Sequence, residues 1–84
     1  MGDNIKRTER ELKLDQMRAC IALGEKAYDD MYESSGSTTG LYSDAKESFR
    51  EAIRLANELG LTEESAALSA RLEHIKAVFR SQFS

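Results

Sequence analysis

The chain has 84 residues, with 12 basic and 15 acidic side chains and a net charge of −3. A chain of this length folds as one small domain, and its mixed, slightly acidic charge does not favour nucleic acid as a partner. No apolar run approaches the roughly 18 residues that cross a bilayer. With one cysteine and no apolar secretion signal after the polar first residues, we expect a soluble, cytoplasmic protein without membrane contact.

The composition favours helices along the whole chain, because proline is absent and alanine, leucine, glutamate, arginine and lysine are plentiful. We expect residues 1–7 to form a flexible N-terminus ahead of a single helical domain over residues 8–84. The first predicted helix covers residues 8–33, and Thr8 and Glu11 have the spacing of a capping box. Behind this box, apolar residues recur at steps of three and four, the spacing of one helix face: Leu14, Met17, Ile21, Gly24, Tyr28 and Met31.

Small polar residues and two glycines predict a loop over residues 34–42. The second predicted helix covers residues 43–59, with Ser43 as its N-cap and Gly60 closing its C-terminus. Its predicted buried face consists of Ala45, Phe49, Ala52, Ile53, Ala56 and Leu59.

The third predicted helix covers residues 62–82, with Thr62 as its N-cap. Its apolar row steps by four, three, four and four through Leu68, Leu72, Ile75, Phe79 and Phe83. The short link between the second and third helices makes them antiparallel neighbours, and the longer loop lets the first helix pack antiparallel to the second. The sequence therefore predicts an all-α fold, an antiparallel three-helix bundle.

The stretch from Cys20 to Gly60 resembles a tetratricopeptide-type helical hairpin. The residues that carry the resemblance are Leu23-Gly24 in the first helix and Ala45-x-x-x-Phe49-x-x-Ala52-Ile53 in the second. In that family small residues let two helices approach closely, and an aromatic ring fills the space between them. The resemblance implies a tetratricopeptide-like hairpin followed by a C-terminal helix.

The chain is also similar to the MIT domain, a three-helix bundle that binds amphipathic helices of its partners. This similarity rests on Tyr42-x-x-Ala45-x-x-x-Phe49-x-x-Ala52-Ile53 and on the apolar row of the last helix. It implies a three-helix architecture and binding of a partner helix in a groove.

Residues that could act in catalysis or bind a metal are few and scattered along the sequence, so we expect no enzyme, no cofactor and no metal site. His74 is the single histidine and has no glycine-flanked serine near it. Cys20 lies in the middle of a helix among apolar residues, where a small core side chain is expected. Asp29, Asp30 and Glu33 form an acidic group at a helix end, without the ligand pattern of a calcium loop.

The sequence is most consistent with a small protein-interaction module or adaptor. We expect it to bind a protein partner, such as a helix, or a second copy of itself through an apolar groove. The alternative is a small nucleic-acid-associated regulator that uses the basic residues of the first helix. The predicted partner-binding residues are Met31, Tyr32, Val78, Phe79 and Phe83.

Overall fold

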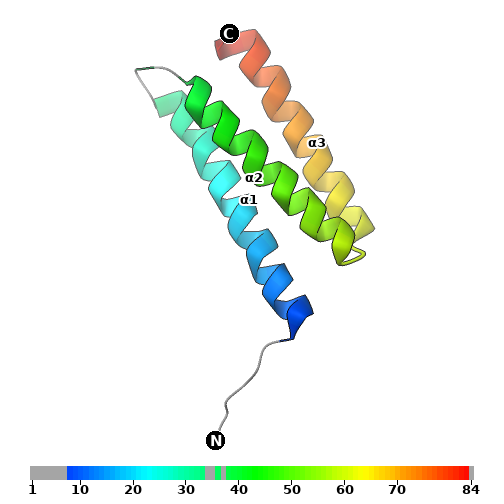
Figure 1. Ribbon diagram of the computed structural model, residues 1–84. Coiled ribbons are helices and arrows are strands. Elements are labelled where there is room, and N and C mark those ends of the chain that lie inside the picture. The colour runs from blue at the N-terminus through cyan, green and yellow to red at the C-terminus, as the bar shows by residue number, and fades with distance from the viewer. Residues whose placement is uncertain (1–7, 34–35, 37, 84) are drawn as a thin grey trace, which may run out of the picture.

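The computed structural model describes residues 8–33, 36 and 38–83. This part of the chain forms three α-helices, α1 (Glu9–Glu33), α2 (Thr39–Glu58) and α3 (Thr62–Val78), followed by a π-helical turn, η1 (Phe79–Phe83). Figure 1 shows α2 between α1 and α3, with each helix antiparallel to the one before it. The predicted antiparallel three-helix bundle is therefore confirmed, while the predicted flexible residues 1–7 lie outside the described part.

The first helix begins where the sequence predicts. The backbone N–H of Thr8 donates to Glu11 Oε1 at 3.0 Å, and the N–H of Glu11 donates to Thr8 Oγ1 at 3.1 Å. This reciprocal pair is a capping box, which satisfies two backbone donors that a helix start leaves without partners.

The second helix begins at Thr39 rather than at Ser43, so residues 39–42 are helical and do not belong to the predicted loop. The N–H of Tyr42 donates to the Thr38 carbonyl at 2.9 Å. Leu41 and Tyr42 pack against the core, and this burial offsets the roughly 1 kcal/mol by which Gly40 disfavours a helix relative to alanine. Of the predicted loop, residues 34, 35 and 37 lie outside the described part.

The turn between α2 and α3 follows the predicted glycine. Gly60 has a φ of 74°, a left-handed conformation that glycine adopts without steric cost. The N–H of Leu61 donates to the Ala56 carbonyl at 2.9 Å, and that of Gly60 donates to the Asn57 carbonyl at 3.1 Å. These two bonds form a Schellman motif, which closes α2 within two residues. Thr62 is the first residue of α3 rather than its cap, because Leu61 precedes the helix.

The centre of the fold is a close approach between α1 and α2. A Cβ atom built on Gly24 would lie 2.6 Å from the ring of Phe49, which is fully buried. Ala45, Ala52 and Ala56 are also fully buried on α2. Small residues on both helices therefore allow the two backbones to approach, and the Phe49 ring fills the space between them. The third helix completes this core with Leu68, Leu72 and Ile75.

Polar contacts hold the N-terminal half of α1 on the last turn of α2. Lys13 Nζ lies 3.2 Å from a carboxylate oxygen of Glu58. Arg10 donates from Nη1 to the Leu59 carbonyl at 3.0 Å. The second contact satisfies a carbonyl at the C-terminal end of α2, where positive charge is favourable.

We expect Gly24→Ala to destabilise the protein, because a Cβ at this position overlaps the Phe49 ring and forces the helices apart. Overpacking of this kind typically costs about 1–3 kcal/mol. Urea unfolding followed by circular dichroism measures the difference. Gly40→Ala is the matched control, since a Cβ at Gly40 meets nothing within 4 Å; it should be neutral or slightly stabilising. An equal effect of the two substitutions would contradict the close approach.

Candidate functional site

Most of the aromatic side chains gather at one end of the bundle, where α1 ends, α2 begins and η1 lies. We call this cluster the aromatic end. It contains five of the six aromatic residues of the chain, Tyr28, Tyr32, Tyr42, Phe79 and Phe83. In Figure 1 it corresponds to the end of the molecule that carries the C-terminus.

The rings contact one another in an unbroken series from α2 to α1. Tyr42 stacks on Phe79, with ring centroids 3.8 Å apart and an interplanar angle of 2°. The ring centroids of Phe79 and Phe83 lie 6.3 Å apart. The ring of Phe83 meets the ring of Tyr32 edge-on, with centroids 5.2 Å apart. Tyr32 in turn meets Tyr28 edge-on at 5.4 Å. One series of rings therefore joins α2, η1 and α1.

An ion pair fixes α3 against α1 beside the aromatic end. Arg71 donates two hydrogen bonds to the carboxylate of Glu25, from Nε at 2.8 Å and from Nη2 at 2.7 Å. The guanidinium of Arg71 also lies 5.0 Å from the centroid of the Tyr28 ring. These hydrogen bonds lower the pKa of Glu25 below its ordinary value. The planar fork of arginine suits both contacts, which a lysine could not reproduce.

The two tyrosines of α1 are linked through their hydroxyl groups as well as their rings. The Tyr28 and Tyr32 oxygens lie 3.2 Å apart. This hydrogen bond, together with burial, raises the pKa of Tyr28 above its ordinary value. The bond also orients the Tyr32 ring.

The structure separates the five predicted partner-binding residues by their exposure. Met31 is 1% exposed and belongs to the core, so its side chain offers no surface to a partner. Val78, Phe79 and Phe83 are partly buried and pack against that core. Tyr32 is 52% exposed and presents the most accessible ring of the aromatic end.

Sequence reasoning did not assign Tyr28 and Tyr42 to this site. Tyr28 falls on the predicted core face of α1, and Tyr42 falls in the stretch predicted as a loop. The π-helical turn was also missed, because an apolar row at steps of four continues through Phe83 as it would in an α-helix. Regular α-helical structure ends at Val78, and Phe79–Phe83 adopt the wider π-turn, a feature often found at functional sites.

Three observations on the described residues bear on the chemistry that this part of the chain could support. No group of three or more histidine, cysteine, aspartate or glutamate side chains in this part of the chain could hold a metal ion. Burial is the main cause that raises the pKa of the Cys20 thiol, followed by the nearby Glu51 carboxylate, and a raised pKa disfavours the nucleophilic thiolate. A shallow depression at the α2–α3 turn is lined by residues 60–64, which include two glutamates but no histidine or cysteine.

Comparison with known proteins gives no significant match to a protein family, to a characterised protein or to a solved structure. Among the described helices, none combines the length and apolar character that a membrane span requires.

We expect the Tyr42 and Phe79 rings to stabilise each other beyond their separate burial. Stacked aromatic pairs contribute about 0.5–1.5 kcal/mol in double-mutant cycles. Urea unfolding of Tyr42→Ala, Phe79→Ala and the double variant measures this coupling. Tyr42→Ala combined with Leu12→Ala, at the far end of α1, should give additive losses. Additive losses for Tyr42 and Phe79 would show that the stacked rings are energetically independent.

The ion pair between Glu25 and Arg71 should make part of the stability depend on pH. Because folding lowers the pKa of Glu25, the ionised carboxylate stabilises the protein above its ordinary pKa of about 4.5 and loses this effect as pH falls through the lowered value. Glu25→Gln should therefore reduce stability at pH 7, and this reduction should shrink as pH falls below about 4.5. Thermal unfolding across this range tests it, with Glu73→Gln as an exposed control. A loss of stability in Glu25→Gln that stays the same at every pH would contradict the prediction.

Proposed function

We propose that the chain is a small, non-enzymatic protein-interaction module that binds a helix of a partner protein at the aromatic end. The observation that carries the proposal is the Tyr32 ring, which is half exposed yet held edge-on between Tyr28 and Phe83. An exposed aromatic ring with a fixed orientation is typical of an interface anchor.

The fixed ring favours binding because little conformational freedom remains to be lost. Two edge contacts and the hydroxyl bond to Tyr28 already orient Tyr32. Tyrosine and tryptophan are enriched among interface hot spots for this reason, since they bring a large area with few rotatable bonds. The partly buried Phe83 extends the apolar surface beside Tyr32. A partner helix could place one or two apolar side chains on this surface.

The similarity to the MIT domain supports a helical partner, because that domain binds amphipathic helices of its partners. The close contact of Gly24 with Phe49 agrees with what the tetratricopeptide resemblance implies. We therefore favour helix binding over other forms of protein contact.

The nucleic-acid alternative is less well supported. It relies on the basic side chains of the first helix, but Arg10 donates to the Leu59 carbonyl and Lys13 pairs with Glu58. Arginine and lysine side chains engaged in this way offer less uncompensated charge to phosphates.

The proposal can be tested with peptides selected from a display library of helices. We expect Tyr32→Ser to weaken binding of the selected peptides at least tenfold, as for an interface hot spot. His74→Ser, which removes another exposed ring from α3, should leave the affinity unchanged. Titration by fluorescence anisotropy measures both variants. A library that yields no binder, or binders that respond equally to the two substitutions, would contradict the proposal.

Two further measurements separate the alternatives. Light scattering of the wild type and of Tyr32→Ser would reveal a Tyr32-dependent dimer if the partner is a second copy. Titration with labelled DNA and RNA oligonucleotides tests the regulator hypothesis. Oligonucleotide binding that falls steeply between about 50 and 200 mM salt would favour that alternative.

A further inference from the structure

A second apolar surface lies on α1, away from the aromatic end. Leu12 is 47% exposed and Leu23 is 60% exposed, and the exposed Ala19 lies between them in sequence. Leu12 and Leu23 are eleven positions apart, which is about three helical turns and brings them to the same side of α1. We call Leu12, Ala19 and Leu23 the leucine row. It extends for roughly 17 Å along the helix axis.

The row faces outward on a helix that is firmly held. Gly24, which faces α2, is one position and therefore about 100° around the helix from Leu23. The capping box at Thr8 and the contacts of Arg10 and Lys13 with α2 fix the N-terminal half of α1. The leucine row is thus a preformed surface on an ordered helix.

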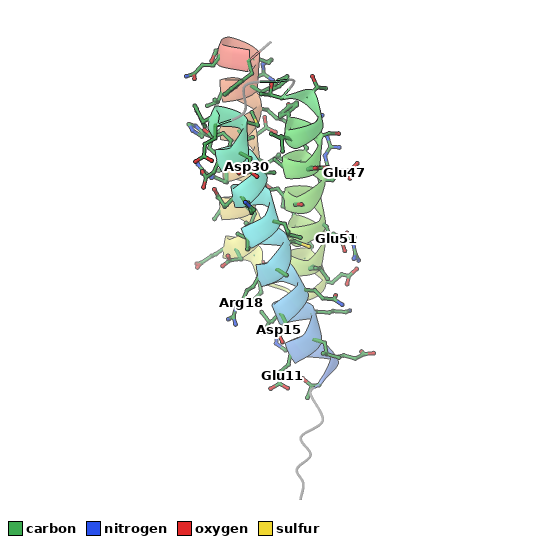
Figure 2. The ribbon with its side chains drawn as sticks, turned by 90° about the vertical axis from the view of Figure 1, so that its left-hand side faces the viewer. Glu11, Asp15, Arg18, Asp30, Glu47 and Glu51 are labelled. Atoms are coloured by element: carbon green, nitrogen blue, oxygen red, sulfur yellow. The ribbon has the colours of Figure 1, made fainter. Side chains whose placement is uncertain are left out.

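Carboxylates border the row on both helices. The antiparallel register, marked by Gly24 against Phe49 and by the Lys13–Glu58 pair, places Leu23 level with Glu47 and Glu51. In Figure 2, Glu11, Asp15 and Asp30 lie along α1, and Glu47 and Glu51 lie on the adjacent α2. Arg18 lies on α1 near Asp15 in the same view.

The cations near the row are largely engaged with these carboxylates. Lys26 pairs with Asp30 at 3.5 Å, and Arg54 is held between Glu51 and Glu58. Within the described part of the chain, Glu47 makes no ion pair. Six carboxylates therefore face four cations around the row, which leaves the surface negative: Glu11, Asp15, Asp30, Glu47, Glu51 and Glu58 against Lys13, Arg18, Lys26 and Arg54.

We propose that the leucine row binds a basic amphipathic helix of another protein. The partner's apolar side chains would lie on Leu12, Ala19 and Leu23, and its lysines or arginines would face Glu47 and Glu51. The surrounding charge argues against other occupants. A second copy meeting this face by two-fold symmetry would bring carboxylates against carboxylates, and nucleic acid or an anionic membrane would be repelled.

A designed peptide tests this directly. The probe is a helical peptide of about 18 residues with leucines at i, i+4, i+7 and i+11 and lysines along one flank. Its matched control carries glutamates in place of the lysines. We expect the lysine peptide to bind at least tenfold more tightly than the glutamate peptide, and its affinity to fall as salt rises. Chemical-shift changes in the protein should map to α1 around the leucine row.

Variants of the protein locate the contact. Leu23→Ser and Leu12→Ser, both at exposed positions, should each weaken the lysine peptide about tenfold, while Ala70→Ser on the exposed face of α3 should have no effect. Glu47→Lys should weaken the lysine peptide and strengthen the glutamate peptide. Circular dichroism confirms that each variant remains helical.

The surface does not depend on the aromatic end, so Tyr32→Ser should retain full affinity for the lysine peptide. Loss of binding in Tyr32→Ser, or shifts confined to Tyr32 and Phe83, would overturn the leucine-row proposal while leaving the aromatic end as a binding site. Equal binding of the two peptides, no binding of either, or indifference to both leucine substitutions would also overturn it.

Discussion

The fold depends on the contact between Gly24 and the ring of Phe49. A side chain at Gly24 would overlap the ring, so α1 can approach α2 this closely only at a residue without a Cβ. The fully buried alanines of α2 extend the close approach in both directions along the helix. Fixing this crossing also fixes the register of the two helices. The ion pair of Lys13 with Glu58 and the hydrogen bond of Arg10 to Leu59 then fall into place at the far end.

The position of α3 follows from a different set of interactions. Its apolar residues pack mainly on α2, and it reaches α1 through the Glu25–Arg71 pair and the aromatic end. Because α2 covers one side of α1 and α3 covers a limited part of another, the outer side of α1 remains exposed. The leucine row exists because α1 is held by one neighbour along its length and by a second neighbour only near its C-terminal end.

The fold class, the capping box and the helix end at Gly60 could be predicted because each depends on residues close together in the sequence. The start of α2 could not be predicted in this way, since Gly40 and the threonines around it favour a loop locally. Residues 39–42 are stabilised as a helix by the packing of Leu41 and Tyr42 on the core and by the stacking of Tyr42 on Phe79, which are contacts with residues far away in the chain. The aromatic end was predicted in part, through Tyr32, Phe79 and Phe83. Met31 was predicted both in the apolar row of the first helix and as a partner-binding residue, and the structure places it in the core at 1% exposure.

The two surfaces lie on opposite sides of the same helix. Tyr32 follows Leu23 by nine positions, which corresponds to a rotation of about 180° around α1. A helix bound along the leucine row would therefore not obstruct a partner at the aromatic end. Glu25 and Tyr28, whose pKa values are shifted, make contacts within or between the helices, Glu25 with Arg71 and Tyr28 with Tyr32, and these contacts help to hold α1 in place. If partners bind at both proposed surfaces, one ordered helix would hold two proteins together, and we therefore propose the role of an adaptor.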